Sequence, residues 1–210
     1  MPKIIKILFA FALLCSFVGG NAQSFEQELK DAVKTKPTFE FRMDSRHSFI
    51  NQKGVKTAGV KVGIQFAEKL SFGLGYNQLW SPRTGIILEN KVETKVQLGF
   101  FNFSPYVEYV FFRDKKWELS IPVQIGLGSS YYSIKSGSGK EKLRNDFVMS
   151  YEPAITFQYR LLRYFGVGLG IGYRFMVIPN SKLEEKFTSP VYIIKTRIYF
   201  QDILRDLNID

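Results

Sequence analysis

An unbroken alternation of apolar and other side chains, from Trp117 to Leu127, is the feature that most restricts the fold of this chain. Every second residue of the run is bulky and apolar, and polar residues, proline or glycine stand between them. A second run, Phe165 to Phe175, repeats the pattern with glycine at most intervening positions. Period-two alternation over about ten residues is typical of a β-strand between an apolar and a polar medium. Because the opposite face carries glycine and ionisable groups, the pattern favours a barrel in a lipid bilayer with a polar interior.

Residues 1–22 have the features of a secretory signal peptide. A basic start with two lysines precedes an apolar stretch, Ile7 to Val18, and a small-x-small cleavage site ends at Ala22. The apolar stretch is too short to cross a bilayer as a helix. The single cysteine, Cys15, lies within this segment. We therefore predict an exported chain that has no disulfide, catalytic thiol or cysteine-ligated metal.

The chain is basic, with a formal net charge of +10. Nucleic acid and anionic lipid are both possible counter-charges, but an exported protein is separated from nucleic acid. Lipid headgroups are therefore the expected partner, and lysines that only solubilise loops are the alternative. No later apolar run approaches the length of a transmembrane helix, so membrane insertion has to use strands.

Eight segments of alternating character follow the signal. We predict strands at about residues 38–49, 55–66, 70–80, 96–111, 117–127, 147–159, 165–175 and 191–200. The fourth is irregular, because Val96, Leu98 and Phe100 are out of phase with Phe101 and Phe103, which predicts a β-bulge near Phe100-Phe101. Short turns at 67–69, 113–116 and 161–163 alternate with longer links at 51–54, 81–93, 134–146 and 179–189. Short turns on one rim and longer loops on the other are typical of membrane barrels.

The volume of the barrel lumen decides whether the apolar face points inward or outward. Soluble lipid carriers also have eight strands, but their apolar face lines the interior. An eight-stranded barrel has a lumen only wide enough for side chains or one small ligand. The apolar face here holds roughly forty residues, many of them aromatic, which exceeds what that lumen holds at normal packing density. We therefore predict that the apolar face points outward.

The inward face then carries acidic and basic residues in nearly equal number. Unpaired charges in a narrow lumen would be very costly. We predict an interior ion-pair network of Glu40, Arg42, Asp44, Lys61, Glu108, Glu118, Glu152, Arg160, Arg174, Lys195 and Arg197. The network favours a plugged barrel, and a small gated channel or proton path is the alternative.

These patterns divide the chain into four parts. They are a signal peptide at 1–22, a periplasmic amphipathic segment at 23–36, a transmembrane barrel at 37–200 and a periplasmic tail at 201–210. The second part places Phe25, Leu29 and Val33 on one face of a short helix. In the tail, Ile203 and Leu207 favour a helical cap.

The signal segment, the alternating strands and the closing segment Tyr192 to Phe200 resemble the small eight-stranded outer-membrane barrels of the OmpA and OmpX type. The resemblance implies an all-β, antiparallel, up-and-down transmembrane barrel with a short N-terminal amphipathic helix, located in the outer membrane. It also implies contact with outer-membrane lipid and lipopolysaccharide. The barrel-assembly machinery reads a last strand that ends in an aromatic residue, although here Gln201 to Asp210 continue beyond it. Such a resemblance informs the fold and not the activity.

Candidate catalytic chemistry centres on His47, the single histidine. Some eight-stranded barrels modify lipid A with a rim histidine and a serine or aspartate, and Asp44, Ser45 and Ser48 are close to His47 in sequence. Because His47 and Ser48 are adjacent on a strand, they point to opposite faces. A Ser–His pair would need a serine from another strand. We predict no enzymatic activity, no metal and no cofactor.

The basic residues Lys140, Lys142 and Arg144 are candidates for contacts with lipopolysaccharide phosphates, and solvation of their loop is the alternative. We expect a monomeric, non-enzymatic barrel with a structural or adhesive role, or one that docks another envelope protein. An accessory subunit of a secretion machinery, contacted through 23–36 and 201–210, is one alternative. Modification of lipid A through His47 is the other.

Overall fold

The computed structural model describes residues 22–50, 53–81, 83–89, 92–136 and 139–207. The predicted signal peptide, apart from its last residue, lies outside the described residues. The elements are α2 (Ala22–Val33), β1 (Thr38–Ile50), β2 (Lys53–Phe66), β3 (Leu70–Leu79), β4 (Arg83–Glu89), β5 (Val92–Arg113), β6 (Trp117–Ser136), β7 (Gly139–Leu162), β8 (Phe165–Ile178), β9 (Ser189–Ile198) and α3 (Phe200–Asp206).

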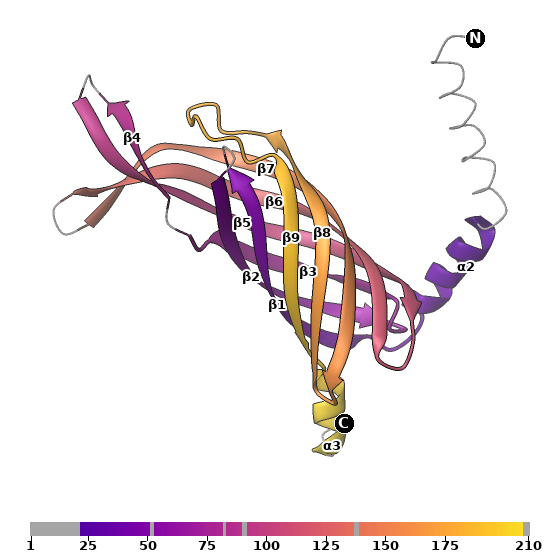
Figure 1. Cartoon of the computed structure of the whole chain (residues 1–210). Helices are drawn as coiled ribbons and strands as arrows, with labels where there is room; N and C mark the ends of the chain where they lie inside the picture. The colour runs from indigo at the N-terminus through magenta and orange to yellow at the C-terminus, as the bar shows by residue number, and fades with distance from the viewer. Residues whose placement is uncertain (1–21, 51–52, 82, 90–91, 137–138, 208–210) are drawn as a thin grey trace, which may run out of the picture.

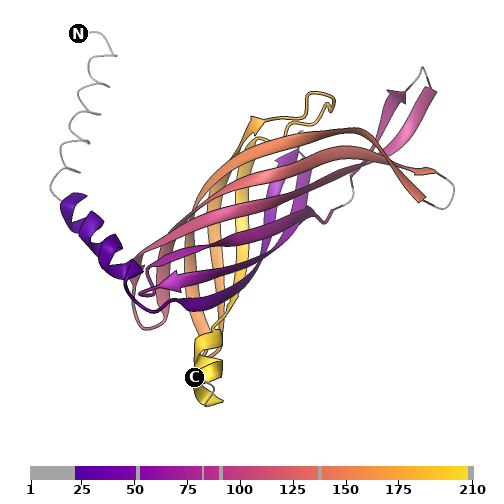
Figure 2. The same ribbon diagram turned by 180° about the vertical axis from the view of Figure 1, so that it is seen from behind.

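The strands form one antiparallel barrel (Figures 1 and 2). Its strand order is β3-β2-β1-β9-β8-β7-β6-β5, and pairing between β3 and β5 closes the ring. Among the described residues, the remaining strand, β4, pairs only with β5 and lies outside the ring. The predicted eight-stranded up-and-down barrel is therefore confirmed.

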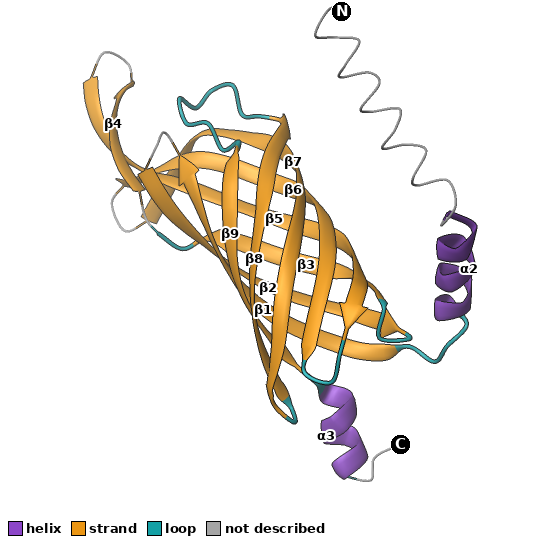
Figure 3. Ribbon diagram, turned by 45° about the vertical axis from the view of Figure 1, so that its right-hand side comes forward, coloured by secondary structure: helices purple, strands orange, loops and turns teal. Residues whose placement is uncertain are grey.

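Two ends of the barrel differ in their connections (Figure 3). We call the end with the short links after β2, β5 and β7, beside α2 and α3, the turn end. The opposite end, which carries β4 and the link 179–188, is the loop end. At the turn end, Ala67 and Glu68 both have positive φ, and the Lys69 amide donates to the Phe66 carbonyl at 2.9 Å. Positive φ at both central residues makes a type I′ turn, whose twist matches the twist of the paired strands.

The apolar face of the barrel points outward, as predicted. In β8, Leu169 and Ile171 are 61% and 63% exposed on the outer wall, whereas Arg174 is buried inside. In β6, Ile121 and Ile125 face outward and Glu118 faces inward. No helix of the described residues is long and apolar enough to cross a membrane.

The predicted β-bulge near Phe100-Phe101 is wrong. Pairing between β5 and β6 runs through Phe100↔Ser130 and Phe101↔Ser129 without a shift, and the register changes instead between Val110 and Phe112. Strand β5 keeps one phase, so Phe100 shares the inner face with Glu108. The apolar residues change sides at this point: they face outward toward the turn end and inward toward the loop end.

Two predicted loops are largely strand. Within 81–93, β4 pairs with β5 from Arg83↔Leu98 to Glu89↔Val92. Within 134–146, β6 and β7 stay paired as far as Ser136↔Gly139. The apolar–polar alternation of side chains is lost in these stretches because the outer face of the strands no longer has to be apolar. The sequence pattern therefore did not reveal the hairpins.

The two helices pack at the turn end. In α2, the Phe25 ring meets Tyr109 of β5 edge-on, with centroids 5.0 Å apart, and Glu28 pairs with Lys69. The last strand ends at Ile198, two residues before the predicted end, and Phe200 begins α3. Its ring packs edge-on against Phe39 of β1 at 5.5 Å, which attaches α3 to the barrel wall.

Candidate functional site

Glu108 of β5 is the centre of the charged part of the lumen. It accepts hydrogen bonds from Arg42 and Ser120, and the Lys195 ammonium donates to it at 3.1 Å. The same ammonium donates to the Thr156 hydroxyl at 2.8 Å. These side chains come from β5, β1, β6, β9 and β7 and are all buried. One carboxylate thus joins strands from opposite walls of the barrel.

A second group of charges lies further toward the loop end. Arg46 pairs with Asp44 at 2.8 Å and also with Glu152, which accepts from Arg174 at 2.8 Å. The Lys61 ammonium lies 3.5 Å from Asp44. Burial of unpaired charges would be very costly, and these contacts offset that cost.

The charges close to the turn end are joined by Arg197. Its guanidinium lies 3.0 Å from Glu118 and 2.6 Å from Glu40, and Glu40 also pairs with Arg42. Together the three groups form a continuous layer across the lumen, which we call the charged layer. It consists of Glu40, Arg42, Asp44, Arg46, Lys61, Glu108, Glu118, Glu152, Arg174, Lys195 and Arg197.

Every residue of the predicted ion-pair network lies in the charged layer except Arg160. Arg160 is part-exposed at the turn end, where it pairs with Asp202 of α3. The prediction of Arg160 as a member of the network is wrong because it lies near the end of β7, at the mouth of the barrel, where α3 supplies its acidic partner. Sequence reasoning also missed Arg46, although it has the same parity on β1 as Arg42 and Asp44.

An aromatic ring fills the lumen beside the charged layer. Tyr106 lies against Gly63 and Gly73, and a Cβ added to Gly73 would stand 2.7 Å from the ring. Lys61 is placed 4.9 Å from the ring centroid, within range of a cation–π interaction. Glycine at these positions is therefore needed to admit the ring. The void left within the charged layer is about 10 Å³, no larger than one water molecule.

The loop end of the lumen is apolar. We call its contents the loop-end cluster: Ile50, Val55, Ile87, Val96, Leu98, Phe100, Tyr132, Val148, Leu183 and Phe187. Two of its members, Leu183 and Phe187, come from the link 179–188, and the Phe187 ring stacks on Phe100 with centroids 5.1 Å apart. The link is therefore folded into the mouth of the barrel. The signal for this cluster was the out-of-phase apolar run on β5.

Hydrogen bonds fix the same link. Asn180 is buried, and its side-chain amide donates to the Ser130 carbonyl at 2.8 Å and the Arg144 carbonyl at 2.9 Å. Its amide oxygen accepts from the Lys182 amide at 2.9 Å. Tyr132 donates to Glu185. These bonds satisfy polar groups that would otherwise be buried unpaired.

The residues predicted to contact lipopolysaccharide are not equivalent. Arg144 lies 3.1 Å from Glu89 and donates to the Leu88 carbonyl, so it holds the β4–β5 hairpin. Lys142 is exposed, with its ammonium 4.4 Å from the Tyr131 ring centroid. The side chain of Lys140 lies outside the described residues.

His47 lies on the opposite face of β1 from two of the three residues that are close to it in sequence. It lies half-buried on the outer face of β1, opposite Lys56 and Tyr192 in register. Ser48 and Asp44 point into the lumen, where Asp44 is held by Arg46. The alternation of strand β1 therefore separates the histidine from Asp44 and Ser48, whereas Ser45 shares its outer face.

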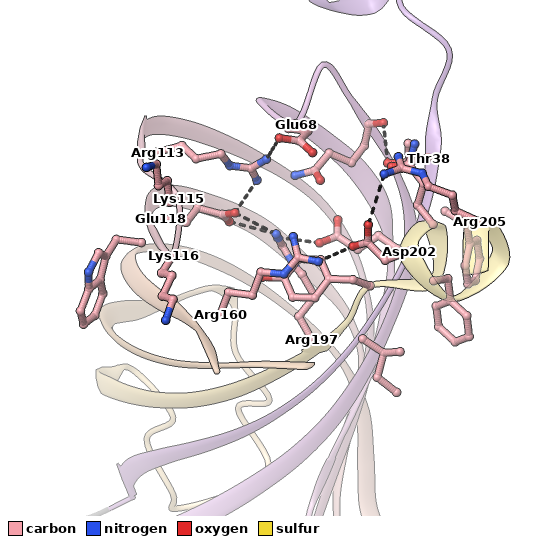
Figure 4. A pocket seen from close by; sticks show the side chains of 18 of the residues that line it. Thr38, Glu68, Arg113, Lys115, Lys116, Glu118, Arg160, Arg197, Asp202 and Arg205 are labelled. Atoms are coloured by element: carbon pink, nitrogen blue, oxygen red, sulfur yellow. Dashed lines mark hydrogen bonds and ion pairs between the residues drawn. The ribbon is translucent and has the colours of Figure 1, made fainter. Parts of the chain in front are cut away.

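A cavity of about 530 Å³, the vestibule, opens at the turn end (Figure 4). Its floor is the turn-end side of the charged layer, with Glu40, Glu118 and Arg197, and α3 contributes Asp202 and Arg205 to its side. The remaining lining residues are Thr38, Phe39, Gln65, Glu68, Arg113, Asp114, Lys115, Lys116, Trp117, Arg160, Ile198, Tyr199, Phe200 and Gln201. The vestibule has the size of a small-molecule site and ends at the charged layer.

Comparisons with known proteins bear on the fold. The sequence matches no protein-family profile, and no curated protein is significantly similar to it. Neisserial surface protein A matches with a TM-score of 0.58 at 12% identity, over 79% of this chain and 99% of that one. Ail of Yersinia pestis matches with a TM-score of 0.48 at 12% identity, over 78% and 98%. The N-terminal barrel of Pseudomonas aeruginosa OprF gives 0.43 at 10% identity, over 78% and 98%. With its closed ring of eight antiparallel strands, the chain has the fold of the small eight-stranded outer-membrane β-barrels.

Proposed function

We propose that this chain is a non-enzymatic outer-membrane barrel that docks a protein partner through a rigid surface at its loop end. The loop end then faces the cell exterior, and the turn end faces the periplasm. The loop-end cluster is the observation that carries the proposal. It fixes the link 179–188 and Ile87 of β4 to the barrel wall.

A rigid surface favours docking because little conformational entropy is lost when a partner binds. The β4–β5 hairpin carries Ile86 and Leu88 with 69% and 66% exposure, and neither belongs to the apolar outer wall of the ring strands. Ile86 and Leu88 have the same parity on β4 and so lie on one face of the hairpin, and contiguous exposed apolar groups rimmed by polar residues mark protein interaction sites. Neisserial surface protein A, which shares the fold, is by its name a surface protein.

The filled lumen supports docking rather than transport. The charged layer and the loop-end cluster follow one another along the barrel axis, and the void within the charged layer is about 10 Å³. We expect no conductance steps when the purified barrel is reconstituted in planar bilayers. Steady single-channel steps would contradict this part of the proposal.

Site-specific photo-crosslinking in living cells tests the docking surface. A benzophenone amino acid is placed at Leu88 in the β4–β5 hairpin, and at Ile125 on the outer wall as the matched control. We expect a discrete protein adduct from Leu88 and none from Ile125. The proposal is rejected when Leu88 gives no protein adduct although the barrel is folded and present at its normal level.

A second function is favoured by the turn end. Val33 of α2 and Leu204 of α3 are 47% and 42% exposed there. An accessory subunit of a secretion machinery would contact its partners through these helices. The same crosslinker at Val33 and Leu204 separates the two functions, because this alternative predicts adducts at the helices and none at Leu88.

A further inference from the structure

Strand β4 leaves one edge of the β4–β5 hairpin unpaired. Among the described residues, β4 pairs with β5 alone, and residues 92–96 of β5 pair with β4 alone. The end of the hairpin is therefore a two-stranded ribbon, which projects from the loop end (Figures 1, 2 and 3). A two-stranded ribbon has only marginal stability in water, and its edge presents backbone N–H and C=O groups that another strand can bind.

The edge formed by β4 lacks the usual protection against strand addition. Exposed edges normally carry charged side chains or proline, and β5 carries Glu93 and Lys95 on its side of the ribbon. Strand β4 has only threonine, glycine, isoleucine and leucine between Arg83 and Glu89. An uncharged edge that contains β-branched residues favours the addition of a further strand, held by main-chain hydrogen bonds.

The charges at the two ends of β4 make the strand complementary to a second copy of itself. Ile86 is the central residue of the seven, with Arg83 three positions before it and Glu89 three positions after it. In an antiparallel pair centred on Ile86, Arg83 of each copy faces Glu89 of the other, and Thr84 faces Leu88. Opposite charges that face each other across two strands stabilise the pair. Because even-numbered positions face even-numbered positions, the free backbone groups of the two edges also meet.

We propose that the loop end binds a second copy of this chain by antiparallel pairing of the two β4 edges. This inference rests on the proposed function, because it names the partner of the same docking surface. The two ribbons then form one four-stranded antiparallel sheet in the order β5-β4-β4-β5. Arg144 donates to the Leu88 carbonyl, and that oxygen has a second lone pair with which it accepts a bond from the other copy.

The direction of β4 determines where the two barrels lie. The strand begins beside the barrel, where Arg83 donates to the Ile50 carbonyl, and runs toward the end of the ribbon (Figure 3). Two antiparallel copies therefore extend from barrels at opposite ends of the joined sheet. The pairing links barrels in two facing membranes, so the chain tethers one outer membrane to another. A pair of seven-residue edges is a small contact, and tethering depends on many copies that act together.

Clustering of lipid vesicles tests the proposal. Two vesicle populations carry the full barrel, one with a donor dye and one with an acceptor dye, and we expect energy transfer when they are mixed. Vesicles with the barrel should not cluster with empty vesicles. Equal clustering with empty vesicles, or no clustering of the two barrel-containing populations, would overturn the proposal.

Charge reversal tests the pairing itself. Glu89→Arg places like charges opposite each other, so clustering should fall at least about tenfold when many contacts weaken together. The double variant Arg83→Glu/Glu89→Arg restores opposite charges and should recover clustering, although the contact between residue 89 and Arg144 stays lost. The matched control is Glu93→Arg on β5, which changes the net charge equally and should have no effect. Failure of the double variant to recover, or an equal loss in the control, would overturn the proposal.

Single cysteines determine the register of the paired strands. The one cysteine of the chain is Cys15, so the protein without its signal segment contains only introduced cysteines. Ile86→Cys should form a disulfide between two copies. Leu88→Cys should react faster with Thr84→Cys in a mixture than with itself. Self-reaction of Leu88→Cys as fast as that of Ile86→Cys would contradict the register.

The photo-crosslinker at Leu88 separates failure of this inference from failure of the proposed function. An adduct with a second copy of the chain supports both. An adduct that contains only a different protein overturns this inference and leaves the proposed function standing. Absence of any protein adduct rejects the proposed function and, with it, the inference.

Discussion

The two halves of the lumen are filled by opposite chemistry. Toward the turn end, ion pairs such as Glu108–Lys195 hold the walls together. Toward the loop end, the space between the same strands is filled by apolar side chains such as Phe100 and Phe187. The change follows the environment of the outer wall. Where the outer wall is apolar, the alternating side chains of each strand place polar groups in the interior. Where the strands extend beyond the apolar wall, the alternation places polar groups outside and apolar groups inside, as in a water-soluble sheet.

The largest difference between the halves should come from a buried charge. Glu108→Ala leaves Arg42 and Lys195 without their shared carboxylate, so we expect the free energy of unfolding to fall by about 3–5 kcal/mol. Urea unfolding in lipid vesicles measures it. The control is Glu68→Ala, which removes an exposed partner of Arg113 and should cost less than about 1 kcal/mol. Similar losses for both variants would mean that the charged layer does not stabilise the barrel.

Loss of an apolar side chain in the loop-end half should destabilise the barrel and also release the link 179–188. Phe100→Ala removes a ring that is 2% exposed and stacked on Phe187, and we expect a loss of about 3 kcal/mol. Protease cleavage within 179–188 should accelerate in this variant and not in Glu108→Ala. The matched control, Ile86→Ala at an exposed position of β4, should change stability by no more than about 0.5 kcal/mol. A loss in Phe100→Ala with no effect on cleavage of the link would contradict the role given to the cluster.

A smaller effect is expected from the polar support of the link. Asn180→Ala removes two donors and one acceptor from buried backbone groups, and we expect a cost of about 1–3 kcal/mol that is confined to local opening of the link. Hydrogen exchange of the 182–188 amides should accelerate, while amides of β1 keep their protection. Uniform acceleration over the barrel would show instead that the link is part of one cooperative unit.

The smallest effect concerns α2, outside the barrel. Hydrogen bonds from Lys34 and Gln27 hold the pKa of Asp31 below its ordinary value. A lowered pKa in the folded state means that the contribution to helix stability is present above the ordinary pKa and is lost as pH falls through the lowered one. Titration of the Asp31 carboxyl by NMR should show the lowered pKa, and Lys34→Ala should raise it. An unchanged pKa of Asp31 in the Lys34→Ala variant would show that the hydrogen bond from Lys34 does not lower it.

The barrel was predictable because the alternation of side chains between the two faces of a strand can be read within each strand. Leu169 and Arg174 have to point to opposite faces of β8, and the volume of the lumen decides which face is inside. The same parity placed most of the charged layer correctly. Arg160 has the same inward parity, but it lies at the mouth of the barrel, where Asp202 of α3 is its partner.

The loop end was not predictable in the same way. The phase change at Phe100 has two readings from sequence, a bulge or a change of medium, and only long-range packing with Phe187 separates them. The vestibule was missed for a related reason. Lys115 belongs to the turn between β5 and β6, while Asp202 belongs to a helix, and closure of the barrel brings them to one cavity.

The central claim is that the apolar residues of β5 change sides where the strand leaves the membrane. Spin labels introduced through single cysteines along β5, in the protein without its signal segment, report it most directly in lipid vesicles. Labels at outward positions 103 and 107 should be accessible to oxygen and shielded from a water-soluble nickel complex, whereas labels at outward positions 95 and 97 should show the reverse. Nickel access at 103 and 107, or oxygen access without nickel access at 95 and 97, would contradict the account.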